Sequence, residues 1–249
     1  MALVETAADP DEFVALPASG RRVTRERRVG LSDAAASGRL RLDALARFLQ
    51  DVASDDVNDA GLVGNWVLRR VALAIGDVPR IGELVSLTTF CSGYGSRWAE
   101  RRTTVTAVDR VAAEVVSIWV YVDDLGRPAP LRDWFFDLYA EAAAGRRVSP
   151  RLHHAPPPVT GAETRVWPLR VTDLDVLAHV NNAASWAAVE DELGRREPGR
   201  RVTRAEMEYR APVDLDDAVE LRTLAGPDAL ACWLTCGDEV RTSALVHFG

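Results

Sequence analysis

The residues best suited to chemistry lie close together, between positions 173 and 182. This segment holds carboxylates at Asp173 and Asp175, an imidazole at His179, and carboxamides at Asn181 and Asn182. A carboxylate such as Asp175 can act as a general base for water, or as a nucleophile that forms an anhydride with an acyl group. An imidazole such as His179 can polarise or position the reacting groups. Together these groups indicate a hydrolase that acts on a carbonyl.

The elements around this segment must hold it at the start of a helix. A strand-like run over residues 165–171 precedes it, and alanines recur at helical spacing after it. Asn181 or Asn182 is the predicted N-cap of that helix. Because free N–H groups and the helix dipole favour negative charge at a helix start, Asp175 and His179 are expected beside a site that stabilises an oxyanion.

The order of predicted elements in the first half of the chain repeats in the second. The first half reads as a strand at 21–31, a helix at 41–57 with one apolar face, strands at 66–75, 83–90, 97–107 and 111–122, and a short helix at 131–144. A sheet that buries one face wraps around its single amphipathic helix. The expected fold class is therefore α+β, a tandem hot-dog in which each half is an antiparallel sheet around one central helix.

Three matches set the predicted register of this repeat. Residues 28–33 parallel 170–175, the helix from Leu42 parallels the run after Leu177, and residues 85–87 parallel 219–221. The first match, at an offset of 142, places Asp33 opposite Asp175, whereas the other two have offsets near 134. The first half is thus interpreted as carrying about eight extra residues before its helix. Asp33 has no histidine motif after it and is expected to be structural.

The motif Asp173-Leu174-Asp175 followed by His179-Val180-Asn181-Asn182 resembles that of the acyl-ACP thioesterases, which release fatty acids from acyl carrier protein (ACP). Weaker parallels, such as the Glu-Tyr-Arg at 208–210, extend over roughly residues 21–234. The resemblance implies hydrolysis of fatty acyl-ACP, with Asp175 activating water or substrate and His179 as its polar partner. Asn181 and Asn182 are the expected substrate-binding residues, with helix capping as the alternative role.

The resemblance also implies an organisation into three segments. Residues 1–145 are the expected N-terminal hot-dog domain, which shapes the acyl pocket, and residues 163–249 the C-terminal hot-dog domain, which carries the motif. Residues 146–162 are the predicted linker, since they include Pro156-Pro157-Pro158 and successive prolines favour stiff polyproline II.

Three positions depart from the pattern of the plant members. The Asn two residues after the motif Asp is Leu177 here, and the acidic residue and Cys after Glu-Tyr-Arg are Pro212 and Val213. A mechanism that needs that Asn, Glu or Cys is therefore excluded. An acyl-CoA thioesterase and a non-catalytic acyl-binding hot-dog protein stay open as alternatives. A hot-dog hydratase fits poorly, because its motif carries one more residue between Asp and His.

Composition sets the remaining expectations. The net charge of -7 argues against nucleic acid as a partner. The cysteines at 91, 232 and 236 form no CxxC pair, which favours a reducing, cytoplasmic location, and no run resembles a signal peptide or a membrane span. No cofactor and no metal are expected, since His153-His154 lack an acidic ligand at coordinating spacing.

The expected partner is acyl carrier protein, or CoA as the alternative carrier of the acyl group, and a homodimer is possible. Arginines cluster after the motif helix, at positions 195, 196, 200, 201 and 204. This cluster is interpreted as a solvated face, with a local basic patch for a strongly acidic carrier or for the phosphate of its pantetheine arm as the alternative.

Overall fold

A computed structural model describes residues 13–61 and 64–249 of the chain. The stretch before residue 13, on which the expectation about a signal peptide rests, lies outside the described residues. In the described part, ten strands form one antiparallel sheet in the order β1-β3-β4-β5-β2-β7-β10-β9-β8-β6. The strands are β1 Arg22–Arg28, β2 Asn65–Ile75, β3 Leu84–Tyr94, β4 Trp98–Ala107, β5 Arg110–Val122, β6 Glu163–Val166, β7 Val202–Tyr209, β8 Val219–Ala225, β9 Ala229–Cys236 and β10 Glu239–Phe248.

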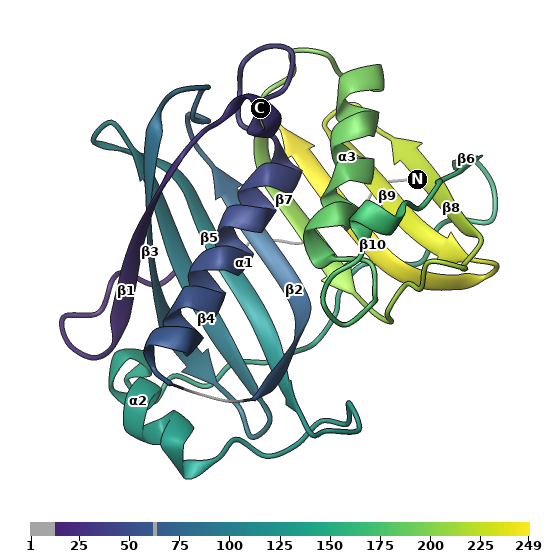
Figure 1. The fold of residues 1–249 in the computed structure, drawn as a ribbon. Coiled ribbons are helices and arrows are strands. Elements are labelled where there is room, and N and C mark those ends of the chain that lie inside the picture. The colour runs from purple at the N-terminus through teal and green to yellow at the C-terminus, as the bar shows by residue number, and fades with distance from the viewer. Residues whose placement is uncertain (1–12, 62–63) are drawn as a thin grey trace.

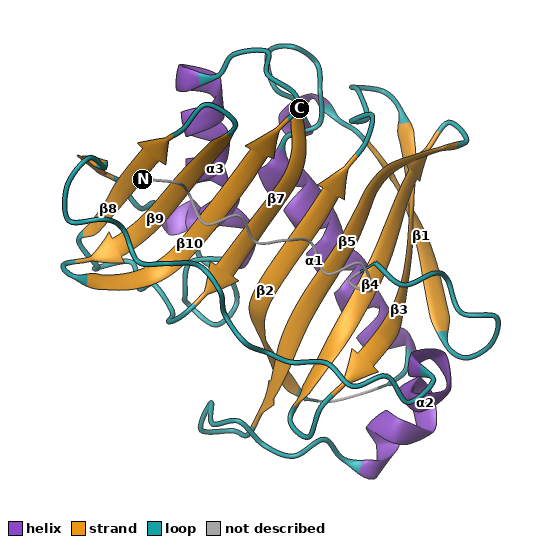
Figure 2. Ribbon diagram, turned by 180° about the vertical axis from the view of Figure 1, so that it is seen from behind, coloured by secondary structure: helices purple, strands orange, loops and turns teal. Residues whose placement is uncertain are grey.

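Three helices and two short 3-10 turns complete the described structure. The helices are α1 Leu42–Asp59, α2 Asp133–Ala143 and α3 Asn182–Arg196, and the turns are η1 Leu31–Asp33 and η2 Val171–Asp173. Figure 1 shows α1 lying across the first five strands and α3 across the other five. Seen from behind, in Figure 2, both helices lie on the same side of the sheet. The expected tandem hot-dog fold is confirmed.

The two halves join where β2 pairs with β7, from Arg70 opposite Glu208 to Ala74 opposite Arg204. Counted from its outer edge inward, the first half has the order β1-β3-β4-β5-β2 and the second half the order β6-β8-β9-β10-β7. Corresponding strands therefore occupy corresponding places in the two halves. The sheet is therefore continuous across the two halves, and the halves are related like the two subunits of a symmetric dimer.

Apolar stripes on the two central helices explain why the sheet wraps around them. Leu45 and Val52 of α1 and Trp186 and Val189 of α3 are buried and belong to one continuous core. Burial of each such side chain contributes about 1.5–3 kcal/mol. Because α1 and α3 also pack against each other, the start of α3 is held next to the first half of the chain.

The structure confirms the repeat but not its predicted register. Leu42 and Asn182 open α1 and α3 and are 140 residues apart, as are the turns η1 and η2. The first half therefore carries no extra residues before its helix, and that interpretation is wrong. The extra length comes later, since α1 has 18 residues and α3 has 15.

Hydrogen bonds in the two turns show which residues correspond. Asp33 and Asp173 each accept a hydrogen bond from the backbone N–H three residues earlier, at 3.0 and 2.8 Å. Asp33 is thus the counterpart of Asp173, and Ala35 stands where the second half has Asp175. The predicted pairing of Asp33 with Asp175 is wrong because it matched residue letters rather than turn geometry.

Residues 146–162 connect the two halves and run across the face of the sheet that the helices leave open (Figure 2). Two tryptophans hold this segment: Trp98 donates to the carbonyl of Val148 at 2.8 Å, and Trp233 to that of Ala155 at 2.9 Å. The connection is therefore anchored to both halves. Among the described helices, none is long and apolar enough to cross a membrane.

Candidate active site

The loop between η2 and α3 is a closed turn. The strand predicted over 165–171 ends at Val166, and the chain then forms η2. The N–H of Asp175 donates to the carbonyl of His179 at 2.9 Å, and Leu174 pairs with Val180. Ala178 adopts the left-handed region at φ 62°, a conformation that non-glycine residues adopt only at a cost. These bonds fix the backbone on which the motif side chains stand.

The carboxylate of Asp175 is half-buried and has one oxygen held by the turn. Its Oδ1 accepts the N–H of Leu177 at 2.8 Å and, more weakly, that of His179 at 3.4 Å. Its Oδ2 accepts no hydrogen bond from any residue in the ranges 13–61 and 64–249. One oxygen is thus fixed in place while the other can accept a proton from water.

His179 is directed toward a carboxylate that the sequence analysis missed. Its Nε2 lies 3.7 Å from Oδ1 of Asp214, and the two backbones pair at this point. Both side chains are exposed, and no hydrogen bond joins His179 to the carboxylate of Asp175 by its ring. In the sequence, Asp214 directly follows Val213, one of the positions that depart from the plant pattern, and this acidic neighbour could have marked it as a candidate.

The two asparagines have different tasks at the start of α3. Asn181 is the N-cap, as predicted, and its side chain accepts the N–H of Ala183 at 2.8 Å. Asn182 is the first helical residue, and its carbonyl accepts the hydroxyl of Tyr209 at 3.0 Å. Burial raises the pKa of Tyr209, so that its hydroxyl remains a donor. The N–H of Asn182 has no acceptor within the helix, as is general for a first helical residue.

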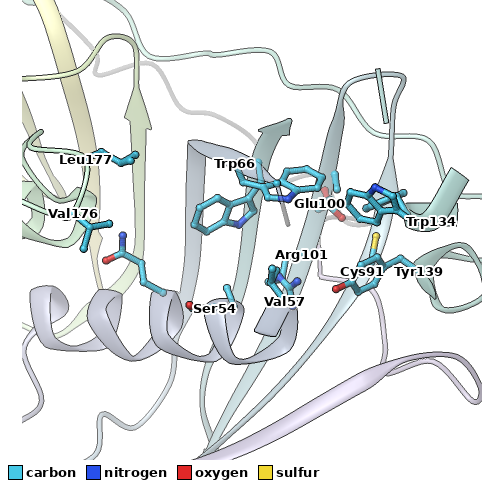
Figure 3. A pocket seen from close by; sticks show the side chains of 16 residues that line it. Ser54, Val57, Trp66, Cys91, Glu100, Arg101, Trp134, Tyr139, Val176 and Leu177 are labelled. Atoms are coloured by element: carbon cyan, nitrogen blue, oxygen red, sulfur yellow. The ribbon is translucent and has the colours of Figure 1, made fainter. Parts of the chain in front are cut away.

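A cavity of about 400 Å³ begins at this loop and extends into the first half (Figure 3). Its volume is in the range of small-molecule sites. From the second half only Val176 and Leu177 line it, at one end, while Trp134 and Tyr139 lie at the other. The rest of the wall comes from the first half and includes the aromatic residues Trp66, Trp119, Trp134, Phe135 and Tyr139.

The end of the cavity remote from the loop is organised by a buried carboxylate. The carboxylate of Asp56 accepts hydrogen bonds from Nε of Arg21 at 2.7 Å, from Nη2 of Arg101 at 2.7 Å and from the hydroxyl of Tyr139 at 3.0 Å. Burial acts to raise the pKa of Asp56, but the two guanidinium groups outweigh it and the pKa lies below its usual value. Burial, together with Asp56, raises the pKa of Tyr139 to about 12.

Cys91 also lines this cavity, and its chemistry bears on the cysteine absent from position 213. Burial raises the pKa of the Cys91 thiol to about 12. A thiol with that pKa is protonated at neutral pH, whereas the nucleophile is the thiolate. Cys91 therefore serves as an apolar wall and does not replace the missing cysteine.

A second cluster of titratable groups lies on the face of the sheet that the linker crosses. His154, Glu206 and Glu208 bring ligand atoms within 4.8 Å of one another. The sequence argument that no acidic ligand lies near His154 is therefore wrong, because both glutamates come from the distant strand β7. Arg70 already bonds Glu206 at 2.6 Å and Arg210 bonds Glu208 at 2.8 Å. With both carboxylates neutralised, the cluster is poorly suited to a divalent cation.

The arginines expected to form a basic patch are largely paired. Arg195 binds Asp191 at 2.8 Å, Arg196 binds Glu163 at 2.8 Å, and Arg200 binds Glu197 at 3.3 Å. These carboxylates cancel much of the positive charge on that side of α3.

Comparison with known proteins agrees with the fold. Residues 20–133 match the acyl-ACP thioesterase N-terminal domain, and residues 158–242 match the acyl-ACP thioesterase C-terminal domain. The crystal structure of an acyl-ACP thioesterase from Bacteroides thetaiotaomicron is 20% identical, with a TM-score of 0.74, and the match covers 92% of this chain and 98% of that one. A 12:0-ACP thioesterase from Umbellularia californica is 17% identical, with a TM-score of 0.77 and coverage of 92% and 97%.

A protein of Mycobacterium tuberculosis, Rv2001, whose own function is uncharacterised, is 27% identical over 239 residues, which are 94% of this chain and 95% of that protein. The fold and the matched domains together define a thioester hydrolase of the tandem hot-dog class. The chain belongs to the acyl-ACP thioesterase family.

Proposed function

We propose that the protein hydrolyses fatty acyl-ACP, with acyl-CoA as the nearest alternative substrate, and that Asp175 is its catalytic carboxylate. The observation that carries this proposal is the position of Asp175. Its free oxygen stands on the same turn as Val176 and Leu177, which line the entrance of the 400 Å³ cavity. An acyl chain inside that cavity has its thioester group next to this turn and next to the start of α3.

In the proposed reaction, water attacks the carbonyl carbon and gives a proton to Asp175. The carbonyl oxygen takes the negative charge and is stabilised by the N–H of Asn182 and the positive end of α3. The intermediate then collapses, the C–S bond breaks with its electron pair on sulfur, and the proton on Asp175 passes to that sulfur. The products are a fatty acid and the thiol of the carrier.

A second route uses Asp175 as the nucleophile. Its oxygen attacks the carbonyl carbon, the thiolate leaves, and water then hydrolyses the resulting anhydride. In both routes His179 is the polar partner, placed beside Asp214, and it positions or polarises the reacting groups. In ¹⁸O-labelled water, ¹⁸O found in the Asp175 peptide by mass spectrometry identifies the second route, because only attack of water on the Asp175 carbonyl of the anhydride can place it there.

The test is single-turnover release of free thiol from long-chain acyl-ACP and from the matching acyl-CoA. Asp175→Asn keeps the size of the side chain but cannot take a proton, so hydrolysis should fall by about 10²–10⁴-fold. The hydrolysis rate of His179→Ala should fall by less if the imidazole only positions the reacting groups. The losses caused by the two substitutions should not add in the double variant. Asp33→Asn is the control, since it makes the same chemical change at the first-half counterpart of Asp173, away from the proposed site, and should keep most activity.

Two results would contradict the proposal. An Asp175→Asn protein with a near-wild-type rate removes the assigned role of that residue. A wild-type protein that binds acyl chains but releases no thiol from either carrier removes the reaction itself.

A further inference from the structure

The two central helices allow a direct comparison of corresponding residues. Both helices begin at equivalent positions, and Gln50 and Glu190 are each the ninth residue of their helix. Glu190 contacts the first residue of α1, and Gln50 lines one small cavity together with the first two residues of α3. Gln50 is therefore the counterpart of Glu190, and the starts of the two helices can be compared residue by residue.

Glu190 shows where an oxygen atom binds at such a helix start. Its Oε2 accepts the N–H of Leu42, the first residue of α1, at 3.1 Å, and Nη1 of Arg39 at 3.2 Å. Its Oε1 accepts the other terminal nitrogen of Arg39. Arg39 is the counterpart of His179, and Ala35 is the counterpart of Asp175. In the first half, an ion pair therefore stands at the positions equivalent to His179 and Gln50.

The corresponding place in the second half is open. Gln50 lines the 400 Å³ cavity together with Val176 and Leu177, and it also lines a cavity of about 20 Å³ together with Asn182 and Ala183. Gln50 thus lines one cavity with the motif turn and another with the first two residues of α3. A carboxamide carries no charge, so no resident anion occupies the position on the Asn182 N–H that Glu190 takes on the Leu42 N–H.

We propose that Gln50 is a catalytic residue supplied by the first half, whose Nε2–H donates to the thioester carbonyl oxygen beside the N–H of Asn182. The proposal rests on the proposed function and adds a second donor to it. A carboxamide offers donor hydrogens without charge, whereas a carboxylate only accepts and would oppose the negative charge that develops on the carbonyl oxygen.

The experiment compares Gln50→Ala, Gln50→Glu and wild type in steady-state hydrolysis of acyl-ACP. Loss of one oxyanion donor typically lowers kcat by about 10²–10³-fold, so Gln50→Ala should fall in that range with KM changed only a few-fold. The kcat of Gln50→Glu should fall at least as far, because the new carboxylate can accept a hydrogen bond from the Asn182 N–H, as Glu190 does from the Leu42 N–H. Both variants should keep the wild-type melting temperature, since Gln50 is only half-buried.

Glu190→Gln is the matched control, because it makes the reverse change at the corresponding position. It should retain the wild-type kcat but melt at a lower temperature, since Arg39 and the Leu42 N–H lose a charged partner. A kcat of Gln50→Ala within three-fold of wild type overturns the role of Gln50, as does an effect on KM alone. If Gln50→Ala is active and Asp175→Asn is inactive, the role of Gln50 is refuted but the proposed function stands. If wild type does not hydrolyse acyl-ACP, both the role of Gln50 and the proposed function are refuted.

Discussion

Asp56→Asn should destabilise the protein more than any substitution of an exposed ion pair. The side chain of Asp56 is 2% exposed and joins three elements to α1: Arg21 just before β1, Arg101 of β4 and Tyr139 of α2. An asparagine keeps the shape but leaves two guanidinium groups without their counter-charge. Tyr139 and Arg101 also line the cavity, so the same change loosens the wall of the candidate acyl site.

The magnitude follows from the exposure of the partners. Removing one member of a buried ion pair costs about 3–5 kcal/mol, because the other charge stays buried and unpaired. The Arg101 side chain is 13% exposed, but that of Arg21 is 23% exposed and can turn toward water, so we expect the lower end, about 3 kcal/mol. In a protein of this size, that loss lowers the melting temperature by about 6–12 °C.

Urea and thermal unfolding, followed by circular dichroism, measure this effect. Asp55→Asn is the control, since Asp55 pairs with Arg25 and Arg27 at the surface and its loss should cost less than about 1 kcal/mol. Because the pKa of Asp56 is lowered in the folded state, its contribution is present above the unfolded value near pH 4 and is lost as the pH falls further. An Asp56→Asn protein as stable as the Asp55→Asn control would refute this reasoning.

Two further outcomes are expected. The pKa of His154 is lowered, chiefly by burial, so the unfolded chain binds a proton more readily than the folded protein below about pH 6.5. Between pH 7.5 and 5.5, the free energy of unfolding of wild type, measured with urea, should therefore fall by up to about 1.4 kcal/mol per pH unit more than that of His154→Gln. Leu177→Asn should leave single-turnover hydrolysis unchanged or raise it, since the Leu177 side chain is largely exposed; a loss above tenfold in a folded variant would show that the apolar side chain is needed.

The fold could be predicted because its signals are local. The apolar stripe of Leu42, Leu45 and Val52 defines one helical face, and the strand expected at 66–75 appears as β2 Asn65–Ile75. When each half has one helix followed by antiparallel strands, there are few ways to bury both the apolar face of the helix and one face of the sheet. The N-cap at Asn181 was readable for the same reason, because it depends only on the residues that follow it.

The site could be predicted only in part, because much of it depends on contacts that sequence spacing does not encode. Asp175 and the start of α3 are neighbours in the chain, but Asp214 reaches His179 from a loop after β7, and Gln50 of α1 lines a cavity with Asn182. The register failed at Asp33 because a shared letter outweighed the shape of the turn. That shape is recorded in the left-handed residues Gly38 and Ala178, which only backbone geometry shows to be equivalent.

Charge distinguishes the proposed site in the second half from the related place in the first half. In the first half, Arg39 and Glu190 form an ion pair, and Glu190 also accepts the N–H of Leu42. In the second half, the carboxylate of Asp175 keeps a free oxygen, and the start of α3 lines a cavity together with the uncharged carboxamide of Gln50. Since the cavity and Gln50 come from the first half and the carboxylate from the second, the proposed chemistry needs both halves in one continuous sheet.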